Sequence, residues 1–274
     1  MLSARLFACL LLLAPLGGCR AKVETTAPLF KRTISTAEAP AETLSMSVHY
    51  SFAADGTYTR VAKHKYRLLT DAGVKSWGTI SEMWEPWFQD RPELTATVTT
   101  PDGSKVTLDP STLSAGPAQT YSEQVFSDAQ VLRAPLPALS VGAVVEEVVT
   151  VRSTKPLPWA QVHMEGLQGP IKRGAQEVVI EAPEKMTIRY LIDGTGEAAT
   201  EEVVGGRRKV RWAADALPAL DFPESGLPSD VHYWPRLVFR VHDQSWRDVA
   251  RSYADFVDEA LAGFKPPAPA QAII

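Results

Sequence analysis

The chain has 274 residues, enough for one or two domains, and its 45% hydrophobic and 22% charged residues are typical of a globular protein with a real core. Its formal net charge at pH 7 is -4. Because the chain has no extended cluster of Lys and Arg, this charge argues against a nucleic-acid-binding surface.

The chain begins with an export signal. Arg5 precedes an apolar run, Leu6–Leu16, which is too short to cross a bilayer as a helix, since that takes about 20 residues. The sequence Leu16-Gly17-Gly18-Cys19 resembles the lipobox of bacterial lipoproteins, in which the cysteine is lipidated and the chain is cut before it. We expect a lipoprotein signal peptide over residues 1–18 and a lipid anchor on Cys19; plain secretion with an incidental cysteine is the alternative.

Lipidation of Cys19 would decide the location of the protein and would leave the mature chain without a free cysteine. Arg20 stands where an inner-membrane retention signal usually has Asp, so the resemblance to Gram-negative lipoproteins favours the periplasmic face of the outer membrane. The only other cysteine, Cys9, lies in the signal peptide. The mature chain therefore has no disulfide, no thiolate nucleophile and no cysteine metal ligand. Residues 19–43 are rich in Ala, Thr, Pro and charge, which predicts a flexible tether.

Strand patterns begin at Leu44. Apolar and polar residues alternate from Leu44 to Phe52, as expected for a half-buried strand. A second strand is predicted over Tyr58–Leu69, followed by a turn at Asp71–Gly73 and the segment Val74–Ile80. Further on, the turn Pro101-Asp102-Gly103 predicts a hairpin between Leu94–Thr100 and Lys105–Leu108.

A long strand follows a rigid elbow in the middle of the chain. Pro135 and Pro137 hold the connector extended, and Gly142 stands where the loop enters the strand. From Ala143 onward, alternation places Val145, Glu147, Val149 and Val151 on one face and Val144, Glu146, Val148, Thr150 and Arg152 on the other. Because Glu146 and Glu147 point to opposite faces, they cannot form a catalytic dyad. One of the two is expected to point inward and pair with an arginine.

The second half of the chain continues with short strands. The candidates are Gln176–Ala182, Met186–Ile192, Glu201–Val204, Arg207–Trp212 and Leu237–Val241. Gly205-Gly206 predicts a tight hairpin, and the turn Asp193–Gly196 is expected to serve the pair before it. In all, roughly ten strand candidates with regular turn signals predict an all-β fold, an antiparallel β-sandwich over residues 44–242.

One amphipathic helix, within residues 243–264, breaks this pattern before a tail at 265–274. Ser245 is a good N-cap with Asp248 three residues later. Gly263 and Pro266-Pro267 stop the helix. One face of the helix is apolar: Trp246, Val249, Ala250, Tyr253, Phe256, Val257, Ala260 and Leu261. We expect Trp246, Val249, Tyr253 and Phe256 to contact a partner or the sandwich itself.

Several segments together resemble a bacterial domain of unknown function that precedes transglutaminase-like domains in periplasmic proteins. They are YTRVAKHKYRLLTDAG (58–73), LTATVTTPDG (94–103), PLPALSVGAVVEE (135–147), Trp212 with the proline loop after it, and SWRDVARSYADFV (245–257). The resemblance implies a β-sandwich module whose last helix leads into a papain-like fold carrying Cys, His and Asp. No such second domain is seen here, and without a cysteine nucleophile no catalytic residue is carried over.

Other candidate sites give weaker signals. Trp84, Trp87 and Phe88 are the densest aromatic cluster; they form either a platform for stacking sugar rings or a plug at one end of the sandwich. Two carboxylates, Glu85 and Asp90, flank this cluster, but the sequence does not fix the spacing that glycoside hydrolysis requires. The five histidines show no metal-ligand spacing, so we expect no metal and no cofactor.

The sequence therefore favours a non-catalytic, lipid-anchored module that binds or positions a partner protein or a cell-envelope component. The partner we expect is a separately encoded transglutaminase-like protein or a cell-wall component. Two alternatives remain. The chain could be the N-terminal fragment of a transglutaminase-like cysteine peptidase or amide-forming enzyme, or it could be a carbohydrate-binding or carbohydrate-active protein.

Overall fold

The computed structural model describes residues 39–118, 127–156, 162–220, 234–241 and 245–263. The predicted signal peptide, Cys19, most of the predicted tether and the tail at 265–274 lie outside the described residues. Within the described part, no helix is long and apolar enough to span a membrane.

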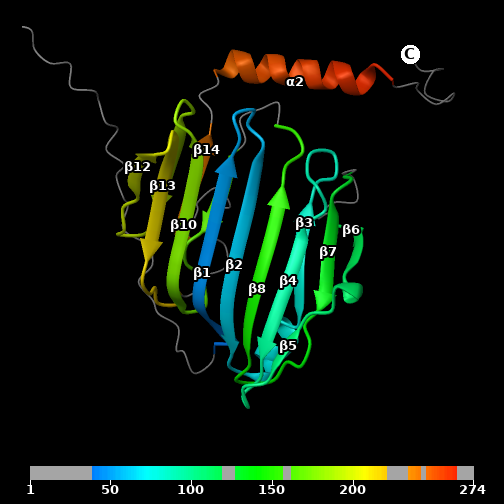
Figure 1. Cartoon of the computed structure of the whole chain (residues 1–274), viewed down its shortest axis with the longest axis vertical. Helices are drawn as coiled ribbons and strands as arrows, with labels where there is room; N and C mark the ends of the chain where they lie inside the picture. The colour runs from blue at the N-terminus through cyan, green and yellow to red at the C-terminus, as the bar shows by residue number, and fades with distance from the viewer. Residues whose placement is uncertain (1–38, 119–126, 157–161, 221–233, 242–244, 264–274) are drawn as a thin grey trace, which may run out of the picture.

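A large mixed sheet of eight strands forms one layer of the molecule (Figure 1). From edge to edge its strands are β12 (Thr200–Val204), β13 (Arg207–Ala214), β10 (Arg173–Pro183), β1 (Ala41–Phe52), β2 (Tyr58–Leu68), β8 (Val144–Arg152), β4 (Glu93–Thr99) and β5 (Lys105–Thr107). All neighbours are antiparallel except β1 and β10, which run parallel.

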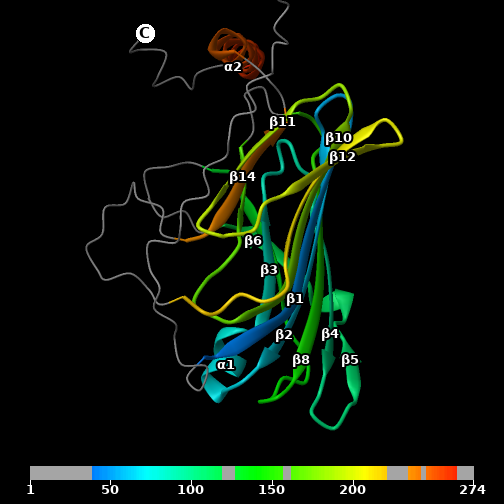
Figure 2. The ribbon, with the colours of Figure 1, turned by 90° about the vertical axis from the view of Figure 1, so that its left-hand side faces the viewer.

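Two three-stranded sheets form the second layer. One contains β11 (Ile188–Asp193), β14 (Arg236–Val241) and β9 (His163–Gly166), and the other contains β3 (Thr79–Trp84), β7 (Gln130–Pro135) and β6 (Ser114–Pro117). Figure 2 shows both small sheets on the same side of the large sheet. The other side of the large sheet, which we call the open face, has no described element packed on it. The predicted all-β sandwich is therefore confirmed.

Two hydrophobic cores lie between the layers, one under each small sheet. The first lies beneath the sheet of β3, β7 and β6 and includes Tyr66, Leu132 and Val145. The second lies beneath the sheet of β11, β14 and β9 and includes Ile180, Trp212 and Phe239. Strands β1 and β2 contribute residues to both cores, so they join the two halves of the sandwich.

The elbow and the strand β8 are confirmed. Gly142 has φ of +88°, a left-handed conformation that glycine adopts without steric cost. Of the face predicted to be buried, Val145, Val149 and Val151 belong to the first core. Glu147 also points inward, but among the described residues its partner is the Tyr66 hydroxyl, which donates a hydrogen bond to it (2.7 Å), and not an arginine. Glu146, on the opposite face, pairs with Lys65.

Strand β1 starts at Ala41, three residues before the boundary that alternation predicts. Ala41 and Thr43 are buried and pair with Leu68 and Tyr66 of β2. The register shifts between Thr43 and Ser45, and this irregularity breaks the two-residue period. For that reason the start of the strand is hidden in the sequence, and the predicted tether is shorter than 19–43.

Three local predictions are wrong. Asp71–Gly73 is not a turn but the start of α1 (Asp71–Ser76), which is capped by the Thr70 side chain. The predicted strand candidates Gln176–Ala182 and Met186–Ile192 do not pair, because β10 and β11 belong to different sheets. Asp193–Gly196 therefore connects two layers. The predicted hairpins β4–β5 and β12–β13 do form.

Helix α2 (Trp246–Leu261) lies across one end of the sandwich, at the top of Figure 1. The predicted cap is present. The Ser245 hydroxyl accepts a hydrogen bond from the Asp248 backbone amide (3.3 Å), and the Asp248 carboxylate accepts one from the Ser245 amide (3.0 Å).

Candidate functional site

The aromatic segment after β3 is divided between core and surface. Trp84 and Phe88 are each 7% exposed, and Trp84 belongs to the first core. Between them the backbone makes a tight turn, in which the Phe88 and Gln89 amides donate to the Glu85 carbonyl (3.1 and 2.8 Å). Burial turns Trp84 and Phe88 into structural residues, so only the half-buried Trp87 still offers a ring to another molecule.

Trp87 is the point where two segments predicted separately from sequence meet. Its ring lies 4.6 Å from that of Phe88 and 5.3 Å from that of Phe256 in α2 (centroid to centroid). The Lys155 ammonium stands 5.3 Å from the Trp87 ring centroid, within cation–π range. Lys155 follows β8 and is 68 positions from Trp87 in the chain, so no local sequence signal pointed to it.

Glu85 sits beside this junction in an acidic setting. Burial and the neighbouring Asp128 carboxylate raise the pKa of Glu85, whereas a hydrogen bond from Trp87 lowers it. The other flanking carboxylate, Asp90, is exposed, and its amide donates to the Arg152 carbonyl (3.0 Å). The acidic neighbour of Glu85 is thus Asp128, a residue the sequence did not single out, and a Glu85–Asp90 pair for glycoside hydrolysis stays a prediction.

The apolar face of α2 is only partly covered. Val249, Phe256 and Val257 are half-buried, whereas Trp246 is 89% exposed, Tyr253 56% and Leu261 55%. Phe256 on this face contacts the sandwich through the ring of Trp87. The helix therefore rests on the end of the sandwich near Phe256 and presents much of its apolar face outward. We call the exposed residues Trp246, Tyr253 and Leu261 the outer stripe.

A buried polar cluster lies where the two small sheets adjoin over β2. Arg60 of β2 bonds Glu165 of β9 (3.1 Å) and pairs with Glu82 of β3 (3.5 Å). The Tyr50 hydroxyl also donates to Glu165 (2.7 Å). Burial and the Glu165 charge raise the pKa of Tyr50 above its usual range, so its hydroxyl stays protonated. The ion pairs bridge β2 to both small sheets, and this role is structural.

Metal-ligating residues do not converge in the part of the chain that the structure describes. His163 is buried among the rings of Tyr50, Tyr58 and Phe239, and burial with the nearby Arg60 charge lowers its pKa to about 4. His64 lies on β2 within hydrogen-bond distance of Thr43 (3.0 Å). His232 and His242 lie outside the described residues.

Comparison with protein families gives the chain an assignment. Residues 54–221, more than half of the chain, match the family described as "Domain of Unknown Function with solved-structure structure (DUF3857)". The chain belongs to the DUF3857 family. The family resemblance seen in the sequence is thereby confirmed, while the link to a transglutaminase-like domain stays a prediction. No curated protein matches the chain.

Among solved structures, one shares the fold of this DUF3857 domain and others resemble it only weakly. A crystal structure of a "putative protease" from Parabacteroides distasonis superposes with a TM-score of 0.67 at 18% identity, over 80% of this chain and 46% of that one. An M1 zinc metallopeptidase from Deinococcus radiodurans gives a TM-score of 0.36 at 10% identity, over 74% of this chain and 43% of that one. The DUF3857 chain thus spans less than half the length of these structures.

Proposed function

We propose that this chain is a non-catalytic binding module that holds a partner protein through the outer stripe of α2. The observation that carries the proposal is the outer stripe itself: a well-capped helix of 16 residues that keeps a tryptophan 89% exposed. Burying a large apolar side chain such as that of Trp246 contributes roughly 1.5–3 kcal/mol, so the exposed tryptophan favours association. Trp and Tyr are also the side chains that dominate binding energy at protein interfaces.

The absence of a thiol in the mature chain supports a non-catalytic role. The two cysteines of the sequence stand at positions 9 and 19, so no residue after the predicted lipidation site can act as a cysteine nucleophile. We further propose that the lipid on Cys19 holds the module at the periplasmic face of the outer membrane. The partner would then be a protein of the same compartment.

A second candidate follows from the Parabacteroides structure, of which this chain matches 46%. In this reading the module is the front part of a longer transglutaminase-like or peptidase protein, and the outer stripe receives the next domain. The third candidate is carbohydrate binding. Of the three rings of the predicted platform, only that of Trp87 is accessible enough to stack on a sugar.

Site-specific photo-crosslinking in cells tests the proposal. A photoreactive phenylalanine analogue replaces Trp246 in one variant and Arg247, on the polar face of the same helix, in the matched control. We expect a protein adduct from position 246 that is absent from position 247. Adducts of equal yield from both positions, or none from position 246, would contradict a partner on the outer stripe.

The adduct then defines the second step. Its protein component is identified by mass spectrometry, purified, and titrated against the wild type and against the variants Trp246→Ala and Arg247→Ala. A central interface tryptophan usually contributes 2 kcal/mol or more, so we expect roughly 30-fold weaker binding for Trp246→Ala. Equal affinities of the two variants would refute the proposed contact.

A further inference from the structure

The open face of the large sheet carries rows of charged side chains, because alternate residues of each strand point to that side. Neighbouring strands pair these charges: Lys65–Glu146 (2.9 Å), Arg211–Glu177 (2.5 Å), Arg152–Glu93 (2.6 Å), Lys209–Glu202 (3.5 Å) and Arg207–Glu181 (3.7 Å). Paired charges of this kind keep a wide sheet soluble without creating a strong field of one sign.

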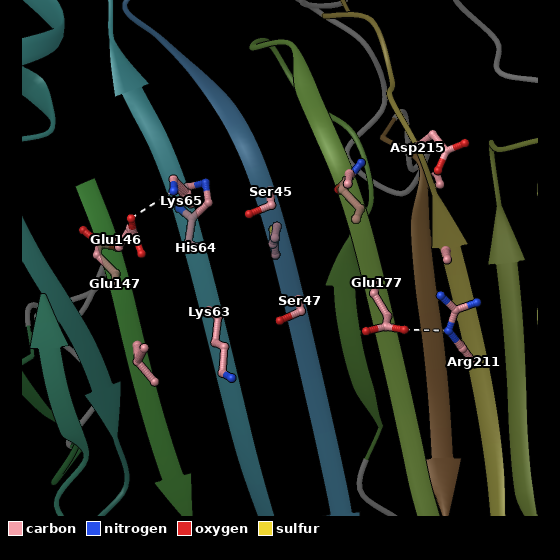
Figure 3. A pocket seen from close by; sticks show the side chains of 16 residues that line it. Ser45, Ser47, Lys63, His64, Lys65, Glu146, Glu147, Glu177, Arg211 and Asp215 are labelled. Carbon is pink, nitrogen blue, oxygen red and sulfur yellow. Dashed lines mark hydrogen bonds and ion pairs between the residues drawn. The ribbon is translucent and has the colours of Figure 1, made fainter. Parts of the chain in front are cut away.

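Small side chains interrupt these rows and leave a depression. Strand register sets Ser45 of β1 beside Ala175 of β10, and Ser47 beside Glu177, which in turn lies opposite Ala213 of β13. A hollow of about 480 Å³ lies over these residues. Figure 3 shows Lys63 and Lys65 along one side of it, and Glu177, Arg211 and Asp215 along the other. The hollow thus has a floor of small residues between two charged walls.

Two of the wall charges are not neutralised within the described part of the chain. Lys63 on β2 and Asp215 just after β13 are both exposed, and neither forms an ion pair with another described residue. Between their strands lie β1 and β10. Three strand spacings of ~4.8 Å separate the two walls by ~14 Å at the backbone. The strand registers place Asp215 level with Lys65, one side-chain repeat of ~7 Å beyond Lys63 along the sheet, so the unpaired cation and the unpaired anion stand diagonally across the hollow, ~16 Å apart at the backbone.

We propose that this hollow binds a short zwitterionic peptide, with its carboxylate at Lys63 and its ammonium at Asp215. A free peptide of four or five residues spans ~13–18 Å when extended, which matches the diagonal separation of Lys63 and Asp215. Along the floor, the hydroxyls of Ser45 and Ser47 can donate to and accept from peptide groups. A ligand with one charge sign would meet repulsion, because Glu146 and Glu177 stand beside Lys65 and Arg211.

This site is separate from the outer stripe of α2. The hollow lies on the open face, over the middle of β1, whereas α2 crosses one end of the sandwich (Figure 1). Its occupation neither requires nor blocks the proposed partner. The failure of one proposal therefore leaves the other standing.

Calorimetric titration of the purified protein tests the site with three probes: tetra-alanine with free termini, its N-acetyl form and its C-terminal amide. We expect the free peptide to bind about 5–10-fold more tightly than either blocked form, since each block removes one charge-assisted contact. No saturable binding up to about 10 mM, or equal binding of all three probes, would overturn the proposal.

Two variants assign each end of the peptide. Lys63→Met should remove the preference for the free form over the amide, and Asp215→Asn should remove the preference for the free form over the N-acetyl form. Lys105→Met, which removes an exposed charge on β5, is the matched control and should retain both preferences. These exposed substitutions leave the fold intact, which thermal unfolding verifies. If Lys63→Met and Lys105→Met have the same effect, only non-specific charge attraction operates and the site is refuted.

Discussion

Two tryptophans mark the extremes of this molecule. Trp212 on β13 is 0% exposed and packs in the second core with residues from β1, β10 and β14. Trp246 opens α2 and is 89% exposed. The sandwich is held by contacts between residues far apart in the chain, whereas α2 has its own capping box and touches the end of the sandwich through Phe256 and Trp87. The same side chain is therefore structural in one region and available for binding in the other.

The largest expected effect comes from replacing each of the two tryptophans with alanine and comparing the free energies of unfolding. Trp212→Ala should lower the free energy of unfolding by about 3–5 kcal/mol, because it leaves a cavity in the core. Trp246→Ala should change the same quantity by less than about 0.5 kcal/mol. Urea denaturation measures both. A loss of several kcal/mol for Trp246→Ala would show that α2 is an integral part of the sandwich.

A second test compares ion pairs. Arg60→Met leaves the carboxylate of Glu165, a residue only 6% exposed, without its cation, so we expect about 3 kcal/mol loss of unfolding free energy. Lys65→Met breaks the pair with Glu146 on the open face, where both side chains are about half exposed, and should cost at most ~1 kcal/mol. Equal losses in urea denaturation would mean that water reaches the buried polar cluster around Arg60 and Glu165 more readily than the burial of Glu165 indicates.

The third test uses the pH dependence of stability, which reports on the buried histidine His163. Burial, with the Arg60 charge, lowers the pKa of His163 to about 4, below the usual value near 6.5 that applies in the unfolded chain. Between these two values the unfolded state binds a proton that the folded state does not. The free energy of unfolding should therefore fall as pH drops from about 6.5 to 4, by up to roughly 3 kcal/mol. Burial and the Arg173 charge lower the pKa of His64 to about 4 as well, so His163→Leu should reduce the slope in that window without abolishing it. Urea denaturation at each pH measures the slope, and an unchanged slope would contradict the contribution of His163.

The smallest effect concerns the helix alone. Ser245→Ala removes the N-cap of α2 and should cost about 1 kcal/mol of local helix stability, so that amide exchange in the first turns accelerates roughly fivefold. The free energy of global unfolding should stay unchanged. Ser252→Ala, within the same helix, is the control and should not accelerate exchange. A drop in the free energy of global unfolding for Ser245→Ala would show that α2 unfolds together with the sandwich.

Much of the local structure could be read from the sequence. The alternation of side chains along the strand predicted the two faces of β8, and turns that contain glycine predicted the hairpins β4–β5 and β12–β13. These features could be predicted because they depend on residues close in the chain. The capping box at Ser245 is local in the same sense. The short helix α1 was missed, since six residues that include a glycine carry too little helical periodicity.

Tertiary structure alone decided which elements meet. The parallel pairing of β1 with β10 joins residues about 130 positions apart, and no local pattern encodes such a register. The same holds for the contact of Phe256 with Trp87, for the bond of Glu147 to Tyr66, and for the placement of Lys63 and Asp215 on opposite sides of one hollow. Sequence by itself determined the faces of β8, the turns of the hairpins β4–β5 and β12–β13, and the cap of the helix. Which side chains share a core, a junction or a hollow depends on long-range packing, because each strand is stabilised only by the neighbours that the whole fold supplies.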